Sequence, residues 1–300
     1  MGEIMRGKIN KISITGIVFH LVLSIFSLFC IIPIIYIVSI SLTDENTLSL
    51  YGYKLVPKVV STYAYQFVLA SPKQILTSYG VTILVTAIGS ILSLLVTSML
   101  AYTMSRRDFK LSRIISFVVF FTMIFNTGLV PWYILIVKYY HINNTLLCLI
   151  LPYVIVPWNV FLMKGFLSDI PLALVESAKI DGSSELNTFF KIIIPISKPA
   201  LATVGLFCAF MYWNDWWLGM LFIEKQSLTP LQLMLYSIMN NITYLSSSLQ
   251  SGNISIDVSK MPNETARMAM CVLAAGPMLF VFPFFQKFFI RGLTVGAVKG

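Results

Sequence analysis

Charge is scarce in this sequence. Asp, Glu, Lys and Arg together make up 11% of its 300 residues, whereas about 25% is usual for a soluble globular domain. Apolar residues account for 57%. Because so few charges do not suffice to cover a surface in water, the composition excludes an ordinary soluble domain. We expect lipid to surround most of the chain, and helices to satisfy its backbone polar groups there.

The sequence also lacks the side chains that most enzymes use. Its two histidines, His20 and His141, stand alone, and a packing role for His20 is favoured over a proton relay. There is no Gly-x-x-x-x-Gly-Lys-Ser/Thr loop, so we do not expect this chain to hydrolyse ATP itself. We expect no catalytic residue, no metal site and no cofactor within the chain. The cysteines fall in four separate apolar stretches and are expected to be packing residues: Cys30, Cys148, Cys208 and Cys271.

Six apolar stretches are long enough to cross a bilayer. A hydrocarbon core of about 30 Å requires about 20 helical residues, and a charge at its centre costs roughly 2.5–3.5 kcal/mol. The stretches hold almost no charge, and the first is too long for the apolar part of a signal peptide. The sequence predicts an all-α polytopic membrane protein whose transmembrane domain covers residues 16–290. The predicted spans are 16–42, 80–104, 114–137, 146–163, 196–220 and 268–290.

Lys and Arg set the predicted orientation. With six spans, one side of the membrane receives 14 of the 21 Lys and Arg residues, and the side with more is cytoplasmic. The N-terminus (1–15) and the tail (291–300) are therefore predicted to be cytoplasmic. The net charge of +9 follows from this topology and from anionic lipid headgroups, not from nucleic acid. Residues 221–267 are predicted to form an extracellular aqueous loop, rich in Ser and Asn, with little core of its own.

The inner loop, residues 164–195, has the pattern of two helices joined by a turn. The pair 168–169 offers an N-cap for the first helix, and Pro171 suits its first turn. Gly182 stands where that helix should stop, and a serine of the pair 183–184 can cap the second helix. Pro195 is expected to end the loop at the next span.

This inner loop resembles the EAA loop of permeases from ATP-binding-cassette importers. The family pattern is EAA, three residues, Gly, nine residues, Ile, one residue, Leu-Pro. Here Ser177 replaces the second residue of EAA and Ile194 replaces Leu, while the spacing is intact. The matching residues are Glu176, Ser177, Ala178, Gly182, Ile192, Ile194 and Pro195.

The resemblance implies a six-span importer permease of the type I fold, driven by a separate ATPase. In that family the first helix of the loop seats in a cleft on the ATPase. Leu172, Leu174 and Val175 would then supply apolar contact, Glu176 a carboxylate, and Ala178 room for close approach. The family also implies that the C-terminal tail reaches the interface of the ATPase dimer, through Gly292, Gly296, Lys299 and Gly300.

Three further segments resemble carbohydrate importer permeases of the maltose type. They are residues 126–131, 213–216 and 291–300. Within that class the chain is most similar to the branch that serves polysaccharide breakdown products, including uronate-containing oligosaccharides. The resemblance implies uptake of an oligosaccharide delivered by an extracellular binding protein, across the cytoplasmic membrane of a bacterium. It also implies a second permease in a heterodimer, and two ATP-binding subunits that use ATP and Mg.

Aromatic and amide side chains at the ends of spans are the candidates for the substrate path, because sugars bind aromatic faces and hydrogen-bonding groups. Asp215 is a carboxylate at the outer end of a predicted span, which suggests a gate, a partner contact or an interfacial position. The partner permease could instead hold the sugar alone. The candidates are Asn126, Trp132, Tyr133, Trp213, Asn214 and Asp215.

Two other functions remain open at this point. The importer could take up a different solute, or the protein could be an ion-coupled secondary transporter. The second alternative calls for charged residues inside the spans, of which there are almost none, and for internal repeats, of which none is convincing. An ATP-driven importer is therefore favoured.

Overall fold

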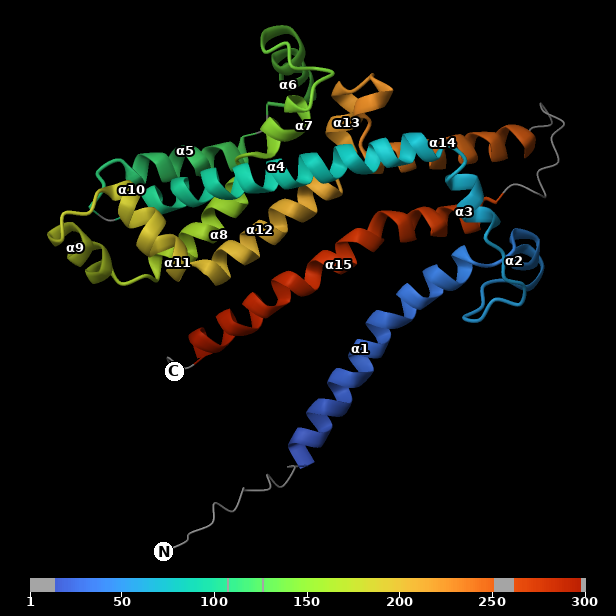
Figure 1. Cartoon of the computed structure of the whole chain (residues 1–300), viewed down its shortest axis with the longest axis horizontal. Coiled ribbons are helices and arrows are strands. Elements are labelled where there is room, and N and C mark those ends of the chain that lie inside the picture. The colour runs from blue at the N-terminus through green and yellow to red at the C-terminus, as the bar shows by residue number, and fades with distance from the viewer. Residues whose placement is uncertain (1–13, 107, 126, 251–261, 298–300) are drawn as a thin grey trace, which may run out of the picture. The chain divides into compact units, whose positions relative to one another are not determined.

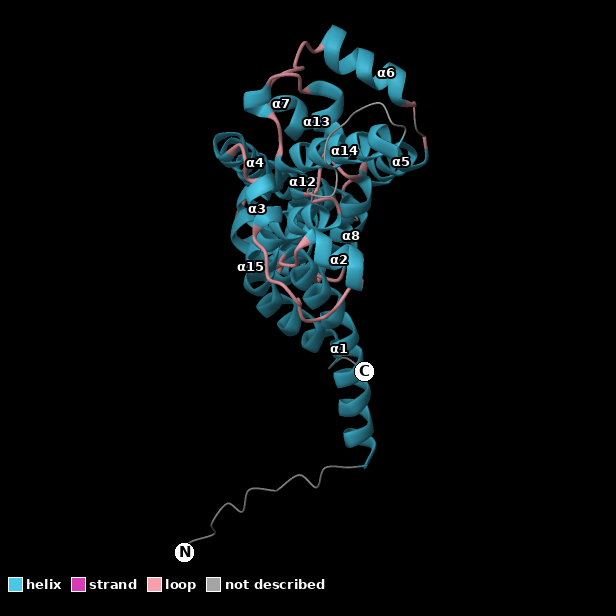
Figure 2. Ribbon diagram, turned by 90° about the vertical axis from the view of Figure 1, so that its right-hand side faces the viewer, coloured by secondary structure: helices cyan, strands magenta, loops and turns pink. Residues whose placement is uncertain are grey.

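A computed structural model describes residues 14–106, 108–125, 127–250 and 262–297. These residues form helices joined by loops, with one isolated bridge between Thr43 and Val60 and no strand among them (Figure 2). The all-α prediction is confirmed. The chain divides into two units, residues 1–68 with 246–272 and residues 69–245 with 273–300, which are described separately.

The first unit begins with α1 (Ile14–Ser41; Figure 1). The apolar side chains of α1 are exposed along most of its length, as suits a helix in lipid. Next come α2 (Glu45–Tyr51) and α3 (Tyr63–Val68). Asp44 caps α2 by accepting a bond from the amide of Thr47 at 3.1 Å. The carboxylate of Glu45 accepts bonds from the amide of Glu264 at 3.1 Å and the amide of Thr265 at 3.0 Å. It thereby provides acceptors for amides in the first turn of α15 (Glu264–Ala297), which have no acceptor within their own helix.

The second unit is organised around α4 (Pro72–Ser105), which packs along α8 (Pro157–Ser168) and α12 (Lys198–Trp213). The side chains between these helices include Ala101, Val160 and Val204, all fully buried. Small residues allow the helices to approach closely. The other elements are α5 (Ser112–Ile124), α6 (Leu129–Ile134), η1 (Leu135–Tyr139), α7 (Leu147–Ile150), η2 (Leu151–Tyr153), α9 (Leu172–Ile180), α10 (Glu185–Thr188), η3 (Phe189–Ile193), α11 (Ile194–Ile196), α13 (Trp217–Phe222), η4 (Gln226–Leu228) and α14 (Leu231–Gln250).

Three helices are long and apolar enough to cross a membrane unaided: 16–41, 72–105 and 264–286. Three bent pairs also qualify, so the described residues hold up to six spans by length and composition. The pair 147–153 and 157–168 bends by 48°, and the pair 185–196 and 198–213 bends by 87°; the third pair is 112–124 with 129–139. The sequence had predicted six uninterrupted runs, and the six-span count stays a prediction.

Local backbone chemistry accounts for two of the interruptions. In the predicted third span, Gly128 has a φ of +81°, which no helix accommodates. In the fourth, Pro157 lacks an amide hydrogen and begins α8, so the helix before it ends. The predicted fifth span, 196–220, is divided between α12 and α13, which begins at Trp217, and the 87° bend lies before α12, at Ser197.

The structure of residues 221–267 differs from the aqueous loop that the sequence predicts for them. It contains α14, a helix of 20 residues. Leu231, Leu235 and Ile242 recur at helical spacing and are buried, which gives this segment a core-facing side. Most of the Ser and Asn residues that suggested an aqueous loop, among them Asn240, Asn241 and Ser246, lie within α14, while residues 251–261 are outside the described part of the chain.

Candidate functional site

The first helix of the inner loop, α9, begins directly after Pro171. Pro171 is the capping residue itself, and its carbonyl accepts a bond from the amide of Leu174 at 3.2 Å. The prediction of a side-chain cap from residues 168–169 is wrong. Ser168 donates to the carbonyl of Lys164 within α8 at 2.8 Å, and Asp169 is the C-cap of that helix. The residue before a proline is disfavoured in a helix, so α8 ends and α9 starts anew around Pro171.

The turn after α9 confirms the prediction for Gly182. Its φ is +77°, a conformation that costs glycine little and other residues more. The amide of Gly182 donates to the carbonyl of Lys179 at 3.0 Å, and the amide of Ser183 donates to that of Ala178 at 2.9 Å. These two bonds form a Schellman motif and satisfy the carbonyls at the end of α9.

The second helix of the loop starts at a serine cap, as predicted. The hydroxyl of Ser184 accepts a bond from the amide of Asn187 at 3.3 Å. Helical structure then runs through α10, η3 and α11 to Ile196. Pro195 does not end the loop: it lies within α11, and the break falls at Ser197 before α12. Of the other matched residues, Ile192 and Ile194 are half-buried on this second helix.

One side of α9 is buried and the other is exposed. Val175 and Ala178 are 4% and 5% exposed and face the rest of the second unit. Leu172, Leu174 and Ile180 are exposed apolar residues, and Ile180 reaches 86%. Glu176 and Ser177 are exposed as well, as is Gly182. An apolar surface of this kind on a loop that is predicted to be cytoplasmic is suited to a protein partner.

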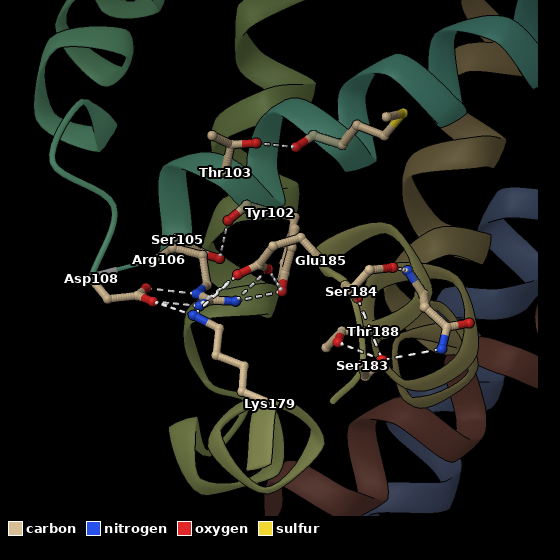
Figure 3. Close-up of polar contacts among 12 residues, drawn as sticks. Tyr102, Thr103, Ser105, Arg106, Asp108, Lys179, Ser183, Ser184, Glu185 and Thr188 are labelled. Carbon is tan, nitrogen blue, oxygen red and sulfur yellow. Dashed lines mark hydrogen bonds and ion pairs between the residues drawn. The ribbon is translucent and has the colours of Figure 1, made fainter. Parts of the chain in front are cut away.

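Four charged side chains meet beside this loop, and we call Arg106, Asp108, Lys179 and Glu185 the charge cluster (Figure 3). Arg106 follows the last residue of α4 and is 7% exposed. Its Nε donates to Oδ1 of Asp108 at 2.7 Å, and its Nη1 donates to Oε2 of Glu185 at 3.1 Å. Tyr102, one turn earlier, accepts from Nη1 of Arg106 at 2.6 Å.

Lys179 closes the cluster from α9. Its Nζ lies 2.9 Å from Oδ2 of Asp108 and 3.1 Å from Oε1 of Glu185. Two cations therefore alternate with two carboxylates, and each carboxylate contacts both cations. The cluster joins the end of α4 to both helices of the inner loop, on either side of Gly182.

The cluster shifts the pKa values of its members toward the charged forms. Hydrogen bonds from Arg106 and then Lys179 hold the pKa of Asp108 well below its ordinary value. Partial burial acts to raise the pKa of Glu185, but the bond from Lys179 and the field of Arg106 outweigh it and lower that pKa. The bonds to Asp108 and Glu185 raise the pKa of Lys179. All four groups are thus charged at neutral pH.

Sequence reasoning did not find this cluster. Arg106 and Lys179 counted only as cytoplasmic charges in the orientation argument. Asp108 lies 71 residues from Lys179, and Arg106 lies 79 from Glu185. No local spacing predicts such contacts, because they depend on how α4 packs against the inner loop.

The residues proposed for the substrate path do not share one environment. Trp132 lines a cavity of about 550 Å³ together with Tyr153 and Trp217. The hydroxyl of Tyr153, which lines this cavity, donates to Oδ1 of Asp215 at 2.9 Å. Asp215 is therefore paired with a lining residue and does not line the cavity itself. Tyr153 was missed, because one tyrosine among 14 carries no sequence signal.

The remaining candidates are packing or surface residues in this structure. Trp213 is 4% exposed and donates from Nε1 to the carbonyl of Ala274 at 2.9 Å. Tyr133 stacks on Phe222, with ring centroids 5.7 Å apart. Asn214 is exposed and bonds to a carbonyl of its own helix. Asn126 lies outside the described residues.

The structure describes only part of the predicted cytoplasmic tail, residues 291–300. The backbone of α15 includes Gly292 and Gly296 and continues to Ala297, so the helix does not end where the predicted cytoplasmic tail begins. Lys299 and Gly300 lie outside the described residues.

The match to a family model identifies this helical membrane protein as a transport permease. Residues 93–295 match the family described as "Binding-protein-dependent transport system inner membrane component", and the chain belongs to that family. It is a permease subunit of an ATP-binding-cassette importer, a transport component and not an enzyme, and the ATPase is a separate subunit. The resemblance seen in the inner loop is confirmed at this level.

The chain is similar over nearly its whole length to named permeases. It is 37% identical to the polygalacturonan/rhamnogalacturonan transport system permease protein YtcP of Bacillus subtilis (strain 168), covering 93% of this chain and 96% of that protein. It is 36% identical to Protein LplC of the same organism, covering 90% of each. A crystal structure of a bacterial ABC transporter involved in the import of the acidic polysaccharide alginate includes a similar chain. The TM-score is 0.75, the identity is 29%, and 93% of this chain and 98% of that chain are covered.

Proposed function

We propose that this permease imports uronate-containing oligosaccharides derived from polysaccharides. The observation that carries the proposal is the 37% identity, over 93% of the chain, to a permease named for polygalacturonan and rhamnogalacturonan. Polygalacturonan is a polymer of a uronic acid. The structural similarity to a chain of an alginate importer, again for an acidic polysaccharide, supports the same substrate class.

The cavity beside Trp132 is the proposed site where this subunit contacts the sugar. Indole and phenol rings of Trp132, Tyr153 and Trp217 offer flat apolar faces to the C–H side of a sugar ring. Thr122 and Thr127 add hydroxyl groups to the lining. Its volume of about 550 Å³ is in the range of small-molecule sites. Asp215 serves in this proposal to orient the Tyr153 hydroxyl, because a free carboxylate facing a uronate would repel it.

An uptake assay tests the substrate class. The complete transporter, with its binding protein, is reconstituted and given labelled trigalacturonate. We expect the labelled trigalacturonate to be taken up. Excess unlabelled trigalacturonate should abolish this uptake, whereas excess maltotriose should leave it unchanged. Competition by maltotriose alone contradicts the proposal.

Substitutions in the cavity test the proposed site. Trp132→Ala or Tyr153→Phe is expected to reduce uptake at least about tenfold, the worth of one or two good contacts. The control is Trp158→Ala, which truncates an exposed indole on α8.

We propose further that α9 is the docking element for the ATPase. Its exposed side offers Leu172 and Leu174 for apolar contact and Glu176 for a donor on the partner. The turn at Gly182 fixes where the helix ends. In the assembly, two ATP-binding subunits use ATP and Mg, a second and different permease completes the path, and an extracellular binding protein delivers the sugar. The proposed location is the cytoplasmic membrane of a bacterium.

Docking is tested with substitutions on the exposed side and at the turn. Glu176→Arg or Gly182→Asp is expected to abolish uptake while leaving membrane insertion intact. Asp169→Arg, at the C-cap of α8 and outside α9, is the control for added positive charge. The detergent-solubilised wild-type complex, expressed with its genomic neighbours, should retain an ATPase on purification. Loss of that ATPase from the wild type, or normal uptake by both variants, would remove the docking assignment.

A further inference from the structure

The helix α9 is held at few points. It has nine residues, and only Val175 and Ala178 among them are buried. Each end is a place where the backbone direction changes, at Pro171 before it and at Gly182, with its φ of +77°, after it. A short helix with a small buried face and a turn at each end can pivot unless something else holds it. Lys179, in its last turn, supplies the other contact through Asp108 and Glu185.

Arg106 fastens that contact to the membrane-embedded part of the chain. It is the buried member of the cluster, with a side chain 8% exposed, against 45% for Asp108 and 57% for Glu185. It directly follows α4, the 34-residue helix that packs along α8 and α12. Its guanidinium uses three nitrogens: Nε and Nη2 on Asp108, and Nη1 on Glu185. A planar fork is suited to bridge two carboxylates in fixed geometry.

We infer that Arg106 is a positioning residue for energy coupling: it makes α9, α10 and the end of α4 move as one body when the ATPase acts on α9. The inference rests on the proposed docking of the ATPase at α9. With the cluster intact, displacement of α9 is passed to α4 through Lys179, the two carboxylates and Arg106. Without Arg106, Asp108 and Glu185 repel each other across Lys179, and α9 turns about its ends without moving α4.

The chemistry of the cluster favours a mechanical role over a purely structural one. Its carboxylates are half-exposed, so ion pairing there adds little to global stability. The cluster instead holds the end of α4, α9 and α10 in a fixed arrangement, because these segments, distant in sequence, all contribute to it. A residue that only stabilises the fold would lower the amount of assembled transporter and leave each assembled transporter fully coupled.

The experiment measures sugar taken up per ATP hydrolysed by the complete transporter in proteoliposomes. Arg106→Gln is expected to lower this ratio about tenfold, with ATP hydrolysis continuing at a rate less dependent on the loaded binding protein. Asp108→Asn, a milder change at an exposed position, is expected to give an intermediate ratio. Arg106→Lys keeps the charge but not the fork, and should resemble Arg106→Gln. The control is Lys110→Gln, at an exposed lysine of the segment between α4 and α5, close to Asp108 in sequence but outside the charge cluster.

A rescue distinguishes positioning from folding. Cysteines replace Asp108 and Lys179 in the Arg106→Gln background, with Cys30 and Cys271 changed to Ser, and a short bismaleimide joins them. We expect the crosslink to recover most of the lost ratio, because a covalent tie replaces the ionic one. An unchanged ratio in Arg106→Gln, or no recovery on crosslinking, overturns the inference. A wild type that neither binds an ATPase nor takes up sugar would instead overturn the proposed function.

Discussion

At position 89, α4 and α12 lie so close that a methyl group does not fit. A Cβ on Gly89 would lie 2.6 Å from the ring of Tyr212. That ring has no room to retreat, because Tyr212 is 2% exposed and its hydroxyl donates to the carbonyl of Ile150 at 2.8 Å. Gly89 therefore sets the distance between the two helices that form the centre of the second unit.

Gly89→Ala is expected to destabilise the protein by about 1–3 kcal/mol, the usual cost of adding a methyl group to a filled core. The measurement is the thermal midpoint of the purified protein in detergent. Gly80→Ala is the matched control: it makes the same change in the same helix, where a Cβ meets nothing within 4 Å. Since alanine favours helix over glycine by about 1 kcal/mol, Gly80→Ala should be neutral or stabilising. Equal effects at both positions would refute the close approach.

Among the elements, α15 depends on a residue far away in sequence for its start. The carboxylate of Glu45 accepts bonds from two amides and from the Thr265 hydroxyl, the last at 2.6 Å. Negative charge at a helix N-terminus also interacts favourably with the helix dipole. The link ties α2 to the first turn of α15 within the first unit.

Glu45→Ala is expected to cost about 1–2 kcal/mol at this helix end, comparable to the loss of an N-cap. Hydrogen exchange at the amides of Glu264 and Thr265 should accelerate by roughly tenfold, since about 1.4 kcal/mol corresponds to a factor of ten. Glu224→Ala, at an exposed glutamate of the other unit, should leave those amides unchanged. Unaltered exchange in Glu45→Ala would show that the cap has no role.

The inner loop should keep its structure over a wide pH range. The pKa values of Asp108 and Glu185 are lowered, so their contribution is complete above the ordinary carboxyl value of about 4 and is lost as pH falls below it. The pKa of Lys179 is raised, so its contribution is complete below about 10.4 and is lost as pH rises through the folded value. Protection of the α9 amides, corrected for intrinsic exchange, should be constant between about pH 5 and 9.

A fall in α9 protection on going from pH 8 to pH 6 would contradict this expectation. Lys179→Met provides the matched variant. Without its ammonium group, α9 should exchange faster at every pH, and the loss of protection at low pH should become smaller.

For the whole molecule, the distribution of Lys and Arg predicts that residues 164–195 are cytoplasmic and residues 221–267 extracellular. Single cysteines at Asp181 and Asn240, both exposed positions, test this in a background without the exposed Cys30 and Cys271. An impermeant maleimide added to intact cells should label Asn240→Cys at once and Asp181→Cys only after permeabilisation. The reverse pattern would invert the topology.

The sequence predicted well whatever depends on composition or on a few neighbouring residues. The apolar runs indicated a membrane protein because transfer into lipid is nearly additive along the chain. Gly182 and the serine pair 183–184 marked the turn and the second helix because each meets a local demand of the backbone, and the structure selects Ser184 of the pair. The same reasoning failed at Ser168, where a hydroxyl that could have capped α9 bonds instead within its own helix.

The sequence by itself determined the class of this protein, the turn within residues 164–195 and the residues that link it to importer permeases. The tertiary structure decided which side chains act together. It brought Arg106 to Lys179 and Glu185, placed Tyr153 against Asp215, and pressed Gly89 onto Tyr212. These contacts join residues distant along the chain, so they exist only once the helices have packed and no local pattern encodes them.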